Sequence, residues 1–183
     1  MKTRTTPAAL IAAALALAGC SGTEELSYGE PAKKDNLEVA VLRVEAGTPA
    51  DLSALEDAAQ YADRTPYYVH YRVTKTEAGE VTGPSFDVMS DGGLLTRLNI
   101  MSGFPEPTVD ADGQLTYQEP PTFDKCLDEH DSAEFKAAPA GESYEGCSVY
   151  LSQPGSTEQP EKVEWVKSGM VRSSDDEAFA VWK

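Results

Sequence analysis

The side chains of this sequence that could bind a metal or carry out a reaction are its three cysteines, its two histidines and the carboxylates beside them. His130 lies in a run of acidic residues and follows Cys126 by four positions, which makes the two a candidate metal-binding pair. Zinc sites need three or four ligands, however, and His70 lies on a distant predicted strand. The sequence therefore predicts no metal site and no bound cofactor.

His130, with Asp128 and Asp131 nearby, is also a candidate for acid–base catalysis, which would make the protein a hydrolase of the cell envelope. Such a histidine needs a nucleophile at a recognisable spacing, and the sequence contains neither Gly-x-Ser-x-Gly nor Ser-x-x-Lys. The glycine patterns that bind phosphates or dinucleotides are missing as well. A histidine among charged loop residues is most often solvated, so the sequence favours a protein that is not an enzyme.

Cys20 ends a Leu-Ala-Gly-Cys motif at residues 17–20, which resembles the lipobox of bacterial lipoproteins. It follows a basic start and an apolar run over residues 8–18, which is too short to span a bilayer as a helix. This pattern is typical of a signal peptide over residues 1–19. The resemblance implies cleavage before Cys20 and acyl chains that hold the protein on the extracytoplasmic face of the cell membrane. The alternative is an ordinary secreted protein with a chance cysteine.

With Cys20 lipidated, Cys126 and Cys147 remain as a pair in an oxidising compartment, which predicts a disulfide. In the chain-entropy model, closing a loop of this length stabilises a fold by roughly 3 kcal/mol. Cys147 shares a predicted strand face with Val149 and Leu151, so the bridge is expected to fasten the region around Cys126 to a sheet. The alternative for these sulfurs is the metal pair with His130.

The charge balance restricts the partners. The chain has 31 acidic and 15 basic residues, a formal net charge of −16. Such a surface repels phosphate backbones, so nucleic-acid binding is disfavoured. It also repels anionic lipid headgroups, so the domain is expected to stand off the membrane that anchors it. Attraction to cations or basic partners stays open, and the simplest explanation is a solvated surface that keeps a secreted domain soluble.

The elements that must position these residues are mostly short strands. Residues 20–36 comprise the lipidated cysteine and a polar stretch with Gly and Pro, which predicts a flexible tether. The folded domain is expected over residues 37–183. Its first strand begins at Leu37, and the alternation of apolar side chains slips by one residue at Leu42, which is typical of a β-bulge.

Thr48, Pro49 and Asp51 form the pattern of a helix start and predict one short helix that ends near Tyr61. The clearest strand covers residues 67–74; its alternation predicts that Tyr67, Val69, Tyr71 and Val73 point one way and that Tyr68 and His70 point the other. Other strands are predicted around residues 86–88, 94–100, 144–152, 162–166 and 178–182. A Pro- and Gly-rich loop over residues 102–121 contains a brief predicted pairing around Leu115 and Tyr117.

About seven short strands and one small helix predict an all-β antiparallel sandwich. The segments LEVAVLRVE, PYYVHYRVTKT, GESYEGCSVYLS and KVEWV occur in that order. They resemble the immunoglobulin-like domain of uncharacterised lipoproteins from high-GC Gram-positive bacteria, which is similar in fold to a small secreted mycobacterial antigen. The resemblance implies an immunoglobulin-like β-sandwich and a location, and it carries no catalytic residues across. The Cys–Trp–Cys spacing of antibody domains is missing, since Trp165 follows both cysteines.

The sequence thus favours a membrane-anchored, extracytoplasmic binding module for an unknown protein or small-molecule ligand. Its candidate binding loops are residues 102–121 and 126–141, at one end of the sandwich. Two alternatives stay open, namely the hydrolase that uses His130 and a passive structural lipoprotein without a ligand.

Overall fold

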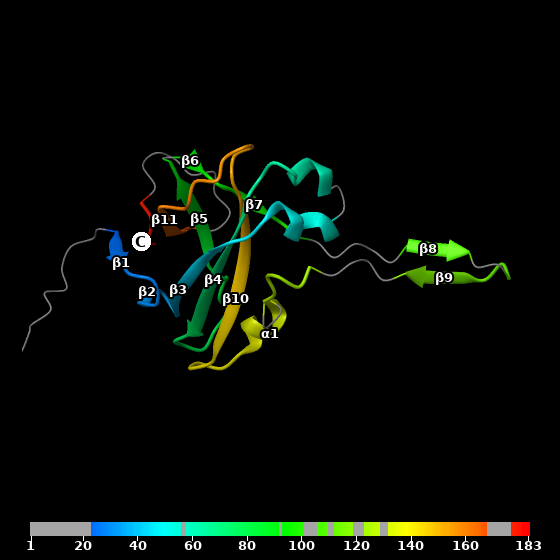
Figure 1. The fold of residues 1–183 in the computed structure, drawn as a ribbon. Helices are drawn as coiled ribbons and strands as arrows, with labels where there is room; N and C mark the ends of the chain where they lie inside the picture. The colour runs from blue at the N-terminus through cyan, green and yellow to red at the C-terminus, as the bar shows by residue number, and fades with distance from the viewer. Residues whose placement is uncertain are drawn as a thin grey trace, which may run out of the picture.

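The computed structural model describes residues 23–55, 58–91, 93–100, 106–109, 112–118, 123–128, 132–167 and 177–183 (Figure 1). Two five-stranded sheets make up the body of the molecule. The sheet that we call the β4 sheet contains, in order, β2 (Ala32–Lys34), β3 (Leu37–Ala46), β4 (Pro66–Lys75), β10 (Ser143–Leu151) and β7 (Thr96–Leu98). The β11 sheet contains β1 (Glu24–Leu26), β12 (Ala180–Trp182), β11 (Lys162–Val166), β5 (Ser85–Ser90) and β6 (Gly93–Leu94).

The order of the main strands is that of a constant-type immunoglobulin domain. Without the short strands β1, β2 and β6 and an outlying hairpin, the first, second, fifth and fourth strands form one sheet, β3-β4-β10-β7. The third, sixth and seventh strands form the other, β5-β11-β12. These orders correspond to the ABED and CFG sheets of the constant-type domain. Their neighbouring strands are antiparallel, which confirms the predicted all-β, immunoglobulin-like antiparallel sandwich.

The core lies between the two sheets and is built by the alternation of side chains along each strand. Phe86 of β5 connects the sheets, since its ring centroid lies 5.0 Å from that of Tyr71 and 6.4 Å from that of Trp182. Large apolar side chains contribute most to stability when they leave water completely, and the tryptophan is fully buried. The buried cluster includes Leu37, Val39, Val41, Tyr67, Val69, Val73, Val88, Tyr150, Val163, Trp165, Ala180 and Trp182.

A β-bulge in β3 lies where the sequence pattern slips. Val41 pairs with Tyr71 of β4, and the next pair is Arg43 with His70, so Leu42 is the extra residue. A bulge reverses the facing of every residue beyond it, which lets Val44 pack against the core although it is out of phase with Val41. The predicted bulge is confirmed.

The N-terminal part of the described chain belongs to the sandwich, so the expected domain boundary at residue 37 is wrong. Strand β1 pairs in parallel with β12, and β2 pairs with the start of β3. The indole Nε1 of Trp182 donates a hydrogen bond of 2.8 Å to the carbonyl of Glu30. These strands lie at sheet edges and are rich in charged residues, so they lack the apolar alternation that marks a strand in sequence.

The helix predicted from Thr48 to Tyr61 is instead two 3₁₀ segments, η1 (Pro49–Ala54) and η2 (Ala58–Tyr61). The start is as predicted, because the Thr48 N–H donates to Asp51 Oδ2 over 2.9 Å. Leu52 is buried, and Ala59 is exposed. A segment this short gains little from α-helical hydrogen bonds, so its contacts with the sheet set its shape. The α-helix of the described chain is α1 (Ser132–Ala137), in a region predicted to be a loop.

Candidate functional site

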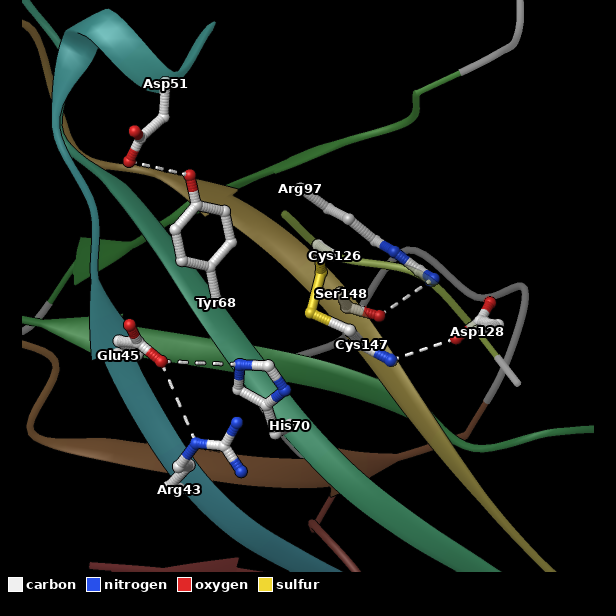
Figure 2. The surroundings of a disulfide bond; sticks show 10 residues. All are labelled: Arg43, Glu45, Asp51, Tyr68, His70, Arg97, Cys126, Asp128, Cys147 and Ser148. Carbon is white, nitrogen blue, oxygen red and sulfur yellow. Dashed lines mark hydrogen bonds and ion pairs between the residues drawn. A yellow bond between two sulfur atoms is a disulfide. The ribbon is translucent and has the colours of Figure 1, made fainter. Parts of the chain in front are cut away.

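The disulfide predicted from the cysteine count is present between Cys126 and Cys147, whose Cα atoms lie 5.2 Å apart (Figure 2). Cys147 lies on β10 at a point beyond the reach of β7, which pairs with Val149, Tyr150 and Leu151. At this point no β7 residue pairs with β10, and Oδ1 of Asp128 instead accepts a 2.9 Å hydrogen bond from the Cys147 N–H. The bridge and this hydrogen bond together fasten the segment before α1 to the strand edge.

The outer face of the β4 sheet carries a second buried cluster around the disulfide. Tyr68, predicted to point away from the core, does so, but only 4% of it is exposed. The η1 segment and the segment that begins at Phe123 cover this face, with the rings of Tyr68 and Phe123 6.3 Å apart. Sequence alternation assigns a side chain to a face and cannot tell whether that face is covered. The cluster contains Leu52, Tyr68, Phe123, Val149 and Leu151, with Cys126 and Cys147 beside them.

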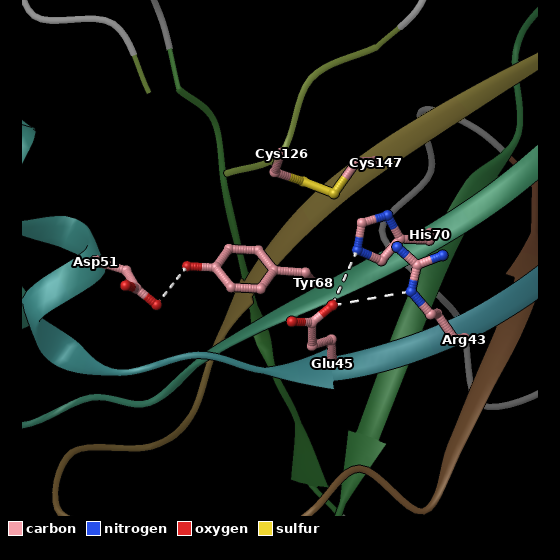
Figure 3. A network of polar contacts seen from close by, with 7 residues as sticks. All are labelled: Arg43, Glu45, Asp51, Tyr68, His70, Cys126 and Cys147. Carbon is pink, nitrogen blue, oxygen red and sulfur yellow. Dashed lines mark hydrogen bonds and ion pairs between the residues drawn. A yellow bond between two sulfur atoms is a disulfide. The ribbon is translucent and has the colours of Figure 1, made fainter. Parts of the chain in front are cut away.

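Asp51 joins the segments that cover this face. Its Oδ2 accepts hydrogen bonds from the Thr48 N–H and from the Tyr68 hydroxyl, the latter over 3.2 Å (Figure 3). Its Oδ1 lies 3.7 Å from Nζ of Lys125. The Thr48 N–H is the main cause that holds the pKa of Asp51 below its ordinary value. Burial, and then the nearby Asp51 carboxylate, raise the pKa of Tyr68 well above its ordinary value.

Among the described residues, His70 is the histidine that lies next to a cysteine, Cys147. It faces Cys147 across the β4–β10 pair, and its Nε2 lies 3.8 Å from Oε2 of Glu45, which also contacts Arg43 (Figure 3). Burial and then the Arg43 guanidinium lower the pKa of His70, so the imidazole is neutral at pH 7. Because Cys147 is in the disulfide, it has no thiol proton for His70 to accept. This group therefore forms no nucleophile–base pair.

A small cavity opens beside Tyr71 on the inner side of β4. Its volume is about 160 Å³, below the 300–1,000 Å³ that is typical of small-molecule sites. Gly146 makes room here, since a Cβ atom at that position would lie 2.5 Å from Cζ of Tyr71. Burial is the main cause that raises the pKa of Tyr71 to about 12. The cavity is lined by Tyr71, Val73, Val81, Gly83, Pro84, Asp128, Phe135, Lys136, Tyr144, Glu145 and Gly146.

The insertion, as we call residues 99–142 between β7 and β10, has a packed end and a projecting part. Its packed end includes α1. The buried Lys75 side chain, at the end of β4, donates a 2.8 Å hydrogen bond to the carbonyl of Lys136 in α1. The Phe135 ring meets the Tyr144 ring edge-on at 5.5 Å. Its projecting part is a hairpin of β8 (Glu106–Val109) and β9 (Leu115–Gln118), which lies outside the sandwich (Figure 1).

The predicted pairing around Leu115 and Tyr117 is confirmed by this hairpin. Gly113, in the turn, has a φ of 78°, which glycine adopts without strain. Of the other residues singled out in the sequence, Cys20, His130 and Asp131 lie outside the described residues. Within the described residues, no group of three or more His, Cys, Asp or Glu side chains is placed to hold a metal ion. The same part of the chain contains no helix that is long and apolar enough to cross a membrane.

Comparison with known proteins yields one structural similarity. No protein-family model matches the chain, and no curated protein matches it either. Among solved structures, it is similar to the crystal structure of an uncharacterized beta-sandwich protein from Clostridium difficile 630. The TM-score is 0.44 at 11% sequence identity, and the match covers 90% of this chain and 96% of that chain.

Proposed function

We propose that this chain is a membrane-anchored, extracytoplasmic lipoprotein that works by binding a partner and not by catalysis. The observation that carries the proposal is the insertion, which has a fastened base and a hairpin that lies clear of the sandwich (Figure 1). Val109, Leu115 and Tyr117 of the hairpin are 67%, 64% and 66% exposed. Apolar side chains held in water on an ordered element are typical of an interaction site.

The base of the insertion is attached to the β4 sheet in two ways and to the η1 segment in a third. The disulfide binds it covalently, Phe123 packs on Tyr68, and Lys125 lies beside Asp51. A binding element on a fixed base loses less conformational entropy when a partner docks than a free loop does. This arrangement supports a binding role better than a passive structural role, which would need no such element.

The anchor part of the proposal rests on the lipobox at Cys20 and on the resemblance to immunoglobulin-like domains of lipoproteins from high-GC Gram-positive bacteria. Replacing Cys20 by Ala should release the protein from the membrane fraction or leave it unprocessed, because acylation needs the sulfur. Cell fractionation with metabolic labelling by a radioactive fatty acid measures both. A variant that is still cleaved and fully membrane-bound would show that the lipobox interpretation is wrong.

The binding part is tested by photo-crosslinking in the native envelope. A benzophenone side chain is placed at Gln114, in the hairpin turn, and as a matched control at Lys33, an exposed position on β2. We expect a defined protein adduct from position 114 and none from position 33. If no position in the insertion yields an adduct while the protein is folded and anchored, the chain does not work through the insertion.

A further inference from the structure

The two faces of the β8–β9 hairpin differ in chemistry. Val109 lies directly opposite Leu115, and Tyr117 follows two residues later, so these three side chains share one face. Thr108 lies opposite Thr116 on the other face, where their hydroxyl oxygens are 2.8 Å apart. One face is therefore apolar and largely exposed to water, and the other closes its own hydrogen bond.

A two-stranded ribbon of this kind gains little stability by itself. An isolated hairpin is marginally stable in water and needs a third strand or a packed face to persist. Figure 1 shows this hairpin outside both sheets, and its apolar residues are, together with Leu127, the most exposed large hydrophobic side chains of the described chain. The apolar face thus has the properties of a surface that is covered in a complex.

The charge around the hairpin identifies the kind of surface that covers it. Residues 98–124 contain five acidic residues and no Lys, Arg or His. The whole chain carries a net charge of −16. A second copy would bring like charges together, and anionic lipid headgroups would be repelled. A surface with a basic rim would instead be attracted to the hairpin and oriented on it.

We propose that the apolar face of the hairpin docks into an apolar groove of a different protein, and that Lys or Arg side chains form the rim of this groove. The inference rests on the proposed binding function and specifies its partner. Leu115 and Tyr117 fill the groove, because interface cores are enriched in aromatic and large apolar side chains. The negative charge of residues 98–124, which contain no basic residue, attracts this basic rim.

The test uses the protein that is crosslinked from position 114, purified, and the full-length lipoprotein in detergent. Calorimetry measures the Kd of wild type, of the double variant Leu115→Ser with Tyr117→Ser, and of the control pair Thr108→Ser with Thr116→Ser. We expect the apolar-face pair to weaken binding about tenfold or more and the threonine-face pair to change it less than about threefold. A conservative pair, Leu115→Ile with Tyr117→Phe, should keep most of the affinity, which separates loss of contact from loss of folding.

The outcomes separate this inference from the proposed function. Unchanged affinity in the Leu115→Ser, Tyr117→Ser pair would overturn the inference and leave a binding role for the insertion. An adduct with lipid or with a second copy of this chain would overturn it too. Binding that weakens as salt is added supports the basic rim, and salt-independent binding contradicts it. Absence of any adduct from the insertion would instead remove the proposed function.

Discussion

Asp51 is the residue through which three segments of the outer face contact one another. It accepts hydrogen bonds from Thr48 and Tyr68 and lies 3.7 Å from Lys125. The pattern Thr-Pro-Ala-Asp was enough to predict the first of these contacts from sequence, because a capping box is local. The other two join residues far apart along the chain, and no pattern in a single sequence records them.

Replacing Asp51 by Ala should lower the free energy of unfolding by about 1 kcal/mol at neutral pH, the ordinary cost of losing a cap, because solvent screens the Lys125 contact. The folded chain holds the pKa of Asp51 below its ordinary value. The carboxylate therefore stabilises the fold fully above the unfolded pKa, and this contribution is lost as the pH falls through the folded pKa. Urea unfolding at about pH 7 and about pH 3 measures the change.

The control for Asp51 is Asp63→Ala, at an exposed position. It should leave the unfolding midpoint unchanged at both pH values. The difference in unfolding free energy between the Asp51 variant and wild type should shrink from about pH 7 to about pH 3. A difference that is the same at both pH values would contradict the assigned role of the carboxylate.

The Cys126–Cys147 bridge gives a second prediction at the residue scale. Both sulfurs should resist thiol labelling of the denatured, unreduced protein. Replacing both cysteines by Ser should lower the free energy of unfolding by roughly 3 kcal/mol, because the bridge closes a loop of 21 residues. Mass spectrometry and urea unfolding provide the two measurements. Quantitative labelling of both cysteines in the untreated protein would show that the pairing is wrong.

At the scale of elements, β10 needs a glycine at position 146 because a larger residue there would collide with a neighbouring side chain. A Cβ atom at Gly146 would meet the Tyr71 ring at 2.5 Å, whereas one at Gly83 would meet nothing within 4 Å. Gly146→Ala should therefore cost about 2 kcal/mol of unfolding free energy, because the Tyr71 ring must move from its present position to make room for the methyl group. Gly83→Ala is the matched control and should be nearly neutral.

A double-mutant cycle tests whether the Tyr71 ring causes this cost. In a Tyr71→Ala background, the further change Gly146→Ala should cost far less than it does alone. Chemical denaturation of the four proteins gives the coupling energy. Additive effects of the two changes would show that Gly146 is required for another reason, such as the local backbone.

The sequence predicted the elements with strong alternation and missed those whose identity depends on neighbours. Strands β4, β10 and β11 were found because each alternates over five residues or more. The expected strand over residues 94–100 is wrong in detail, since the chain changes sheets at Leu95 between β6 and β7. The alternation that predicts this strand continues without a break from β6 to β7. The sequence pattern therefore does not mark the point at which the chain leaves one sheet for the other.

At the scale of the whole molecule, the N-terminal strands test where the domain begins. A chain that starts at Leu37 lacks β1, β2 and the hydrogen bond from Trp182 to Glu30. Its free energy of unfolding should be lower by roughly 3 kcal/mol than that of a chain that starts at Thr23, because an indole N–H loses its acceptor and core residues gain access to water. Urea unfolding of the two chains measures this, and equal midpoints would restore residue 37 as the boundary.

The parallel pairing of β1 with β12 has a mechanical consequence for an anchored chain. The three register pairs from Glu24↔Ala180 to Leu26↔Trp182 lie side by side. Tension applied at the N terminus acts along β1 and loads these pairs together in shear, so they resist as a group and do not peel apart one after another. The β8–β9 hairpin lies across the molecule from β1 (Figure 1). In a chain that is anchored and bound as proposed, the pull between membrane and partner would pass through the sandwich, which the insertion joins at β7 and at the Cys147 disulfide on β10.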